Sequence, residues 1–350
     1  MSINLKTIQP EKILIRATNW IGDAIMTTPA VRTIRRNFPQ AEISILVHPW
    51  VADVFSASPD VDKIILYHKK TEHRGISGIW RLSRELKKNG FDLAILLQNA
   101  FEAALIAYLS AIPLRAGYRR DLRGFLLTHP VNIPWDRKKV HQVYYYQGLL
   151  NDLGLQPGPD ELFLAVQKQD KEKAERLFLD KTQNGPLIGL NPGASYGPAK
   201  RWPAEKYAEL AMKLREKFKA RIAVFGTKDD RKAALLIKKS CEGQIIDLTG
   251  RTSLSKAMAL IDSCAVFVTN DSGLMHVAAA LKTPLVAVFG STNPVTTGPF
   301  SPNATILRKE LPCSPCMQTH CKKNAFACME KITADEALSE VEKLLPPLPC

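Results

Sequence analysis

No apolar run in this sequence approaches the roughly 18–20 residues that a membrane-spanning helix requires. The first residues, MSINLKTIQPEK, contain neither a long apolar core nor a small-residue cleavage site, so we expect no secretory signal. We therefore expect the protein to work in the cytoplasm, where a reducing environment disfavours disulfides between its seven cysteines.

Acidic residues are the scarcer charge, since 34 Asp and Glu stand against 48 Lys and Arg and leave a net charge of +14. A basic balance suggests an anionic partner: nucleic acid, a phosphorylated lipid or an acidic membrane surface. The basic residues near position 120 have little of the aromatic interleaving that stacks bases, so nucleic acid is not favoured. They form either a solvated face or a holder for a phosphorylated acceptor, because Arg suits phosphate. A second basic group lies at residues 137–141.

The length and composition favour two globular domains. A chain of 350 residues that is 45% hydrophobic can bury more than one core, and a charged fraction of 23% argues against disorder. Apolar runs typical of buried strands alternate with amphipathic helical patterns over residues 12–97 and again over residues 187–289. This alternation predicts two α/β units with parallel sheets, whose ligands bind at the carboxyl ends of the strands.

Between these stretches, over residues 153–185, the alternation weakens and Gly and Pro interrupt the chain. We expect an N-terminal domain at residues 1–165, a linker at 166–185, a C-terminal domain at 186–330 and a helix with a tail at 331–350. Within the first domain, the pattern predicts one helix over residues 24–37.

The first loop whose residues could bind a ligand or take part in catalysis follows the first strand. It reads TNWIGD over residues 18–23. Gly22 allows a tight turn and the close approach of a ligand. Asp23 lies at a helix start, where it could cap the helix or accept a proton from an attacking hydroxyl. The loop is not a GxGxxG string, so a dinucleotide site is not indicated here.

A second loop, NPGASYGPAKRWP over residues 191–203, follows the first strand of the second half. Its small residues allow backbone N–H groups to face a phosphate, and Lys200 adds a positive charge. The alternative is a surface loop whose cations are solvated.

A third loop, TNDSGLMH over residues 269–276, is a strand–turn–helix. Asp271 or Ser272 could cap the helix, and the first N–H groups would form an anion pocket at the positive end of its dipole. His276 could face a pyrophosphate, or it could be an ordinary buried histidine. Another Gly/Ser/Thr turn at residues 290–293 ends the next strand, so we expect this half to bind a nucleotide.

Four cysteines near the C-terminus are spaced as C-x2-C-x4-C-x6-C: Cys313, Cys316, Cys321 and Cys328. Four thiols over such a span could hold a structural zinc ion in a tetrahedral site. The alternative is free thiols in a redox-labile loop. The cluster follows the last phosphate-suited loop, so we expect no catalytic role for it.

Taken together, these strings resemble the bacterial lipopolysaccharide heptosyltransferases of glycosyltransferase family 9. NWIGDAIMTTPA looks like the family's first loop, while PGASYGPAKRWP and TNDSGLMHVAAAL look like the branch that adds the second heptose. QNAFEAAL and RAGYRRDLRGFLL also fit that branch, so the resemblance runs over nearly the whole chain. It implies a GT-B fold of two Rossmann-like domains and an inverting transferase that uses ADP-L-glycero-β-D-manno-heptose.

The resemblance also implies roles for single residues. Asp23 matches the family's general base, which would deprotonate an acceptor hydroxyl for in-line attack and give an α-linked product from a β-linked donor. Lys200 matches a lysine that contacts phosphate and would stabilise the leaving ADP, so no metal is required. The expected donor-binding residues are Asn191, Gly193, Ser195, Lys200, Asp271, Ser272, Gly273, Leu274 and His276, with Asp229 or Asp230 as a ribose contact. The expected acceptor-binding residues are Asn19, Trp20, Gly22, Arg119, Arg120 and Arg123.

The implied partners are ADP-heptose and heptosyl-Kdo-lipid A at the inner leaflet, without nucleic acid. The basic groups then suggest peripheral attachment to the inner face of the inner membrane. The sequence does not indicate an oligomeric state. Two alternatives stay open: transfer of heptose or another sugar at another core position, and a non-catalytic protein that binds nucleotides or nucleic acid.

Overall fold

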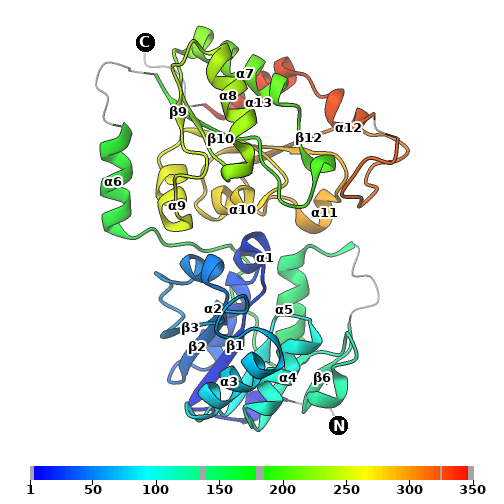
Figure 1. Cartoon of the computed structure of the whole chain (residues 1–350). Coiled ribbons are helices and arrows are strands. Elements are labelled where there is room, and N and C mark those ends of the chain that lie inside the picture. Colours follow the sequence, from blue (N-terminus) through cyan, green and yellow to red (C-terminus); the bar gives the residue numbers. More distant parts are fainter. Residues whose placement is uncertain (1–3, 134–138, 179–184, 324, 346–350) are drawn as a thin grey trace. The chain divides into compact units, whose positions relative to one another are not determined.

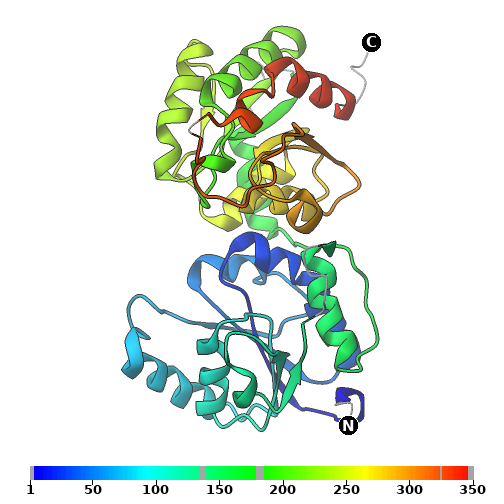
Figure 2. The same ribbon diagram turned by 90° about the vertical axis from the view of Figure 1, so that its right-hand side faces the viewer.

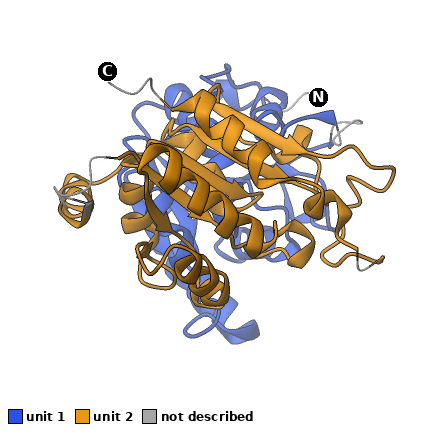
Figure 3. Cartoon of the chain, turned by 90° about the horizontal axis from the view of Figure 1, so that it is seen from above, with its two compact units in different colours: residues 1–164 blue, residues 165–350 orange. Residues whose placement is uncertain are grey.

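The computed structural model describes residues 4–133, 139–178, 185–323 and 325–345. The chain divides into two compact units, Met1–Leu164 and Ala165–Cys350, which Figure 3 colours separately. Each unit contains one six-stranded sheet with helices packed on it (Figures 1 and 2). Every strand pairing in the described residues is parallel, so the prediction of two α/β units with parallel sheets is confirmed. None of the helices in these ranges is both long and apolar enough to cross a bilayer.

Unit 1 contains a sheet with the strand order β3-β2-β1-β4-β5-β6. Its strands are β1 (Lys12–Arg16), β2 (Glu42–Val47), β3 (Lys63–Leu66), β4 (Leu93–Leu96), β5 (Leu114–Tyr118) and β6 (His129–Val131). Its helices are α1 (Ile21–Met26), α2 (Thr28–Asn37), α3 (Gly75–Lys87), α4 (Phe101–Leu109) and α5 (Gln142–Asp152). The central strands are buried along nearly their whole length, which is why they read as continuous apolar runs.

Unit 2 repeats this winding with the order β12-β11-β10-β7-β8-β9. Its strands are β7 (Leu187–Asn191), β8 (Arg221–Val224), β9 (Ile246–Asp247), β10 (Val266–Asn270), β11 (Leu285–Phe289) and β12 (Ala304–Arg308). Its helices are α6 (Lys168–Phe178), α7 (Ala204–Phe218), α8 (Arg231–Ser240), α9 (Leu254–Asp262), α10 (Gly273–Ala280), α11 (Pro294–Thr297), α12 (Ala327–Glu330) and α13 (Ala334–Leu344).

The strand order reverses between β1 and β4 in unit 1 and between β7 and β10 in unit 2. At such a switch point the neighbouring connections leave the sheet toward opposite faces, which opens a crevice at the carboxyl ends of the strands. The loops with candidate site residues follow β1 in unit 1 and β7 and β10 in unit 2.

Two helices outside the regular alternation also pack within unit 2. Helix α6, in the segment that we expected to be a linker, lies against α9, with Lys171 Nζ 3.0 Å from Asp262 Oδ2. Helix α13 packs against α7, and Lys217 Nζ lies 2.8 Å from the carboxylate of Glu342. Both segments therefore have contacts within unit 2.

Our prediction of a single helix over residues 24–37 is wrong, because the structure contains two helices there, α1 and α2, which are separated at Thr27. Pro29 has no N–H group to continue the helical ladder, so the chain ends one helix and begins another. The hydroxyls of Thr27 and Thr28 donate to the carbonyls of Ala24 and Ile25, at 2.6 and 2.7 Å. Helix α1 begins at Ile21, so Asp23 lies in its first turn.

Candidate functional site

In unit 2, most of the predicted donor residues gather at the switch point between β7 and β10. Asn191 is the last residue of β7, and its amide donates to Thr269 Oγ1 at 2.9 Å and to Ser272 Oγ at 2.8 Å. Ser272 is the N-cap of α10, where its hydroxyl accepts from the Met275 N–H. These bonds fix the start of α10 against the ends of two neighbouring strands.

An ion pair with little exposure lies at the same edge of the sheet. Lys200 Nζ is 2.6 Å from Asp271 Oδ2, and the two side chains are 13% and 5% exposed. The Thr292 hydroxyl donates to the same carboxylate oxygen at 2.6 Å, and the Tyr196 ring lies 4.7 Å from Lys200 Nζ. The loops after β7, β10 and β11 thus meet around one cation in a partly desolvated place, where its charge acts strongly on an anion.

The first turn of α10 lies directly after this ion pair in the chain. Gly273 and Leu274 are partly exposed and belong to the turn whose N–H groups have no intrahelical acceptor. His276 is only 3% exposed, so its imidazole lies in the interior beside the loop. Ser195, in the loop after β7, is exposed. The site thus offers a cation and a helix N-terminus, the two groups that bind phosphate most readily.

Asn270 is a residue of this site that the sequence did not single out. It is fully buried, and its Oδ1 accepts from the Trp202 N–H at 3.0 Å and from the Tyr207 hydroxyl at 3.2 Å. Its Nδ2 donates to the Pro192 carbonyl at 2.8 Å. The amide thereby holds both ends of the loop over residues 192–203. A polar residue at the end of an apolar strand was the feature of the sequence from which a role for Asn270 could have been predicted.

Asp230, one of our two alternatives for a ribose contact, has a structural role within its own loop. It is 7% exposed and accepts from the N–H and hydroxyl groups of Thr227, at 2.8 and 2.9 Å, in a capping box before α8. Asp229 is exposed and remains the candidate for the ribose contact. The Asp230 carboxylate also lies so close to Gly193 that a Cβ there would be 2.5 Å from Oδ2.

We predict that Gly193→Ala weakens binding of the nucleotide that we expect at this loop and lowers the free energy of unfolding by about 1–3 kcal/mol, because the Cβ must push Asp230 or the loop aside. Calorimetric titration and thermal unfolding measure the two effects. The control is Gly148→Ala in α5, where the nearest heavy atom to the new Cβ is 3.5 Å away. A Gly193→Ala variant that matches this control in both measurements would contradict the packing argument.

In unit 1, Asp23 is the third residue of α1 and is half-buried. The N-cap position belongs to Trp20, so Asp23 does not occupy the position of a capping side chain. Burial raises the pKa of Tyr146 in α5 well above its ordinary value, and the negative charge of Asp23 adds to that shift. The Asp23 carboxylate is therefore near enough to Tyr146 to act on it electrostatically.

Asn19, in the loop before α1, is held from two sides. Arg16 Nη2 donates to Asn19 Oδ1 at 2.9 Å, and Trp50 Nε1 donates to the Asn19 carbonyl at 2.9 Å. Burial lowers the pKa of Arg16 to about 10, and the charges of Glu102 and Tyr67 partly offset this effect. We did not predict these contacts from the sequence. An arginine at the end of the apolar strand KILIR could have indicated that its side chain bonds to the loop that follows. Trp20 remains largely exposed and Gly22 is buried.

The three arginines predicted to bind the acceptor differ in their surroundings. Arg119 is exposed, and Arg120 is partly exposed with its Nε 3.1 Å from Asp121 Oδ1. Arg123 is fully buried, donates to the carbonyls of Tyr118 and Gln98, and burial lowers its pKa to about 10. This corrects our expectation for Arg123, because its guanidinium fastens the loops after β4 and β5.

Of the second basic group, residues 137 and 138 lie outside the described residues.

We predict that Arg123→Met lowers the free energy of unfolding by about 1–3 kcal/mol, because buried carbonyls lose their donor. Arg119→Met, on the exposed side of the same loop, should keep the melting temperature and weaken binding of the expected phosphorylated acceptor. Thermal unfolding and acceptor titration check both variants. Equal melting temperatures for the two variants would contradict the assignment of Arg123 as a positioning residue.

The zinc hypothesis for the cysteine cluster is not borne out. Burial raises the pKa of the Cys328 thiol, and Cys316, Cys313 and Cys321 contribute to the shift, so the four thiols share one region. However, the described residues contain no group of three or more His, Cys, Asp or Glu side chains that could hold a metal ion.

The segment with these cysteines lies instead against the loops after β7 and β11. The Tyr196 hydroxyl donates to the Met317 carbonyl at 3.1 Å, and the Met317 N–H donates to the Ser291 carbonyl at 2.7 Å. The Ala199 N–H donates to the Thr319 carbonyl at 3.1 Å. The segment therefore supports the loop that carries Lys200.

Comparison with known proteins gives consistent matches. Residues 79–327 match the family model described as glycosyltransferase family 9 (heptosyltransferase). Lipopolysaccharide heptosyltransferase 2 of Salmonella typhimurium is 37% identical over 311 residues, which cover 85% of this chain and 88% of the relative. Lipooligosaccharide heptosyltransferase 2 of Haemophilus ducreyi is 33% identical over 349 residues, which cover 95% of this chain and 99% of the relative.

Solved structures agree with these sequence matches. The E. coli ADP-heptose lps heptosyltransferase II has a TM-score of 0.80 at 32% identity, over 95% of this chain and 98% of the other. The glycosyl transferase family 9 structure from Veillonella parvula has a TM-score of 0.85 at 25% identity, over 95% of this chain and 97% of the other. The matches thus extend over both units.

Proposed function

This chain belongs to glycosyltransferase family 9, the heptosyltransferases, and from that premise we propose that it transfers L-glycero-D-manno-heptose from ADP-heptose to the first heptose of the lipopolysaccharide inner core. The observation that carries the proposal is the similarity, over both units, to relatives named heptosyltransferase 2. Membership of a transferase family also argues against the non-catalytic alternative.

Unit 2 binds the donor in this proposal. The ADP diphosphate lies at the first turn of α10, where N–H groups and the positive end of the helix dipole favour an anion. Lys200, which is paired with Asp271 in the structure, turns to the diphosphate and stabilises the negative charge that develops on the leaving ADP. With these groups in place, the departure of ADP needs no divalent cation to neutralise it.

Unit 1 provides the acceptor site and the base. Asp23 accepts the proton from the attacking hydroxyl of the acceptor heptose, the new C–O bond forms at the anomeric carbon, and the bond to the diphosphate breaks. Attack opposite to the leaving ADP converts a β-linked donor into an α-linked product. The position of Asp23 in the first turn of α1, held by a loop that Arg16 and Trp50 fasten, supports this role.

The acceptor in this proposal is heptosyl-Kdo-lipid A. Arg119 and Arg120 follow β5 and have exposed surface, so they are suited to the phosphates of such a glycolipid. Asn19 and Trp20 lie beside the base and contact the sugar.

The test is an assay with purified protein, ADP-heptose and a core acceptor that carries one heptose. We expect a product heavier by one heptose residue, in an α linkage by nuclear magnetic resonance. A second acceptor that carries Kdo without heptose is the control. Transfer to this control with none to the one-heptose acceptor would assign the enzyme to another core position.

A further inference from the structure

Helix α3 of unit 1 has an unusual outer face. Its inner face packs Leu82 and Leu86 into the core of the unit, so the helix is firmly attached. On the outer face, Ile76 is 80% exposed and Trp80 is 54% exposed, one helical turn apart. Two large apolar side chains with this much exposure have no covering partner in the described residues of the unit.

Cations surround these two side chains. The segment over residues 69–88 contains seven Lys and Arg and two Glu. Arg84 and Lys87 follow Trp80 by four and seven residues, which places all three on one side of the helix. Of the two acids, Glu85 lies 3.3 Å from His73 Nε2. The outer face therefore has a positive balance.

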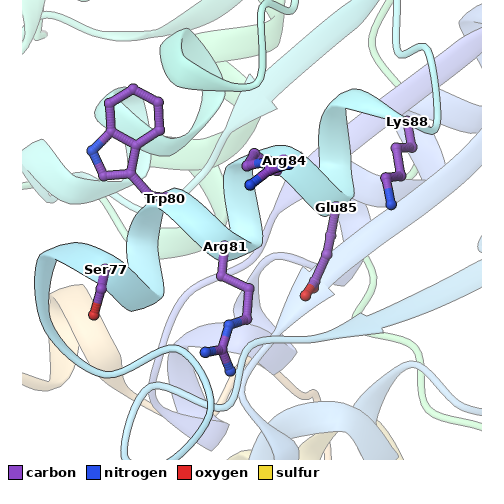
Figure 4. A pocket seen from close by; sticks show the side chains of 6 residues that line it. All are labelled: Ser77, Trp80, Arg81, Arg84, Glu85 and Lys88. Atoms are coloured by element: carbon purple, nitrogen blue, oxygen red, sulfur yellow. The ribbon is translucent and has the colours of Figure 1, made fainter.

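An open hollow of about 540 Å³ lies along this face. Figure 4 shows its lining, five side chains of α3 and that of the residue after it: Ser77, Trp80, Arg81, Arg84, Glu85 and Lys88. Arg81 and Glu85 project side by side, while Trp80 leaves the helix in another direction. The lining thus combines one aromatic ring with three cations and a single carboxylate, and its positive balance suits phosphate groups beside an apolar layer.

We propose that the outer face of α3 is a docking surface for an anionic phospholipid bilayer. The ring of Trp80 and the side chain of Ile76 enter the headgroup region, where amphipathic aromatic rings are favoured. Arg81, Arg84, Lys87 and Lys88 contact lipid phosphates, because a bilayer offers a continuous negative surface that matches a row of cations along a helix. The proposal goes beyond sugar transfer, and vesicle binding is measured without donor or acceptor.

The test uses the full chain and vesicles of phosphatidylcholine with or without phosphatidylglycerol. We expect co-sedimentation with the anionic vesicles, weakened by salt, and a blue shift of tryptophan emission that is absent in Trp80→Phe. Each cation near an anionic surface strengthens binding about fivefold, so the Arg81→Glu/Lys88→Glu double variant, which loses two cations, should bind at least about 25-fold more weakly. Trp80→Ala should also bind more weakly.

Matched controls lie on α8 of unit 2. Lys232→Glu/Lys239→Glu changes two exposed cations with the same spacing, and Leu235→Ala removes an apolar side chain that is 61% exposed. The proposal is supported if these controls bind like the unmodified chain while the α3 variants lose binding. It is overturned if the unmodified chain does not bind anionic vesicles, or if the α8 variants lose as much as the α3 variants. Transfer to a delipidated acceptor, measured on the same variants, reports separately on the proposed function and on folding.

Discussion

Asp23→Asn lowers the rate of heptosyl transfer by about a hundredfold to ten-thousandfold, the range that a general base contributes. The amide keeps the shape of the carboxylate but cannot accept the proton of the acceptor hydroxyl. Single-turnover kinetics with saturating donor and acceptor measure the loss. The affinity for ADP-heptose should stay unchanged, because the donor loops belong to the other unit.

The matched control for Asp23→Asn is Glu11→Gln, an exposed carboxylate directly before β1 at the amino end of the sheet. This variant should transfer heptose at the normal rate. If Asp23→Asn also turned over at the normal rate, Asp23 would not be the base, and its role would reduce to the electrostatics of the first turn of α1.

Lys200→Met lowers the rate of transfer by about a hundredfold to a thousandfold, because the leaving ADP loses a preorganised positive charge. It should also weaken ADP-heptose binding, which Asp23→Asn does not. Calorimetric titration with ADP-heptose and steady-state kinetics distinguish the two variants. Lys206→Met in α7 is the control, since Lys206 is paired only loosely with Glu209, at 3.9 Å, and should not affect transfer.

The loss of Lys200 has a second effect, on stability. It leaves the buried Asp271 carboxylate without its cation, which costs on the order of 3 kcal/mol. The double variant Lys200→Met/Asp271→Asn removes the stranded charge and should recover much of that stability without recovering transfer. Recovery of transfer together with stability would show that Lys200 acts through folding and not on the diphosphate.

The sequence predicted the central strands well, because β1, β2, β7, β10 and β11 are buried along nearly their whole length and consist mostly of apolar residues. It did not predict β5, β6 and β12, which lie outside the two stretches of alternating pattern. Their sequences LRAGY, HPV and ATILR are only partly buried and have no continuous apolar run. Strands β6 and β12 lie at the edges of their sheets, where a strand is defined by its neighbour more than by its own composition.

The candidate site likewise contains residues that the sequence indicated and residues that it did not. Lys200, Asp271 and Ser272 were visible in the sequence because small residues and caps at strand ends have a local physical meaning. Arg123 could not be separated from Arg119 and Arg120, since a run of arginines does not reveal which guanidinium finds buried carbonyls. Thr292 belonged to a turn already noted, but its bond to Asp271 joins loops 21 residues apart and is fixed only by the sheet.

In the proposed mechanism, a carboxylate of unit 1 acts on a sugar whose diphosphate is bound by unit 2. The decisive experiment is a crystal structure with a non-transferable ADP-heptose analogue and a one-heptose acceptor. We expect the Asp23 carboxylate within about 3 Å of the acceptor hydroxyl, with Lys200 on the diphosphate. An Asp23 far from both sugars, with another group on the hydroxyl, would contradict it.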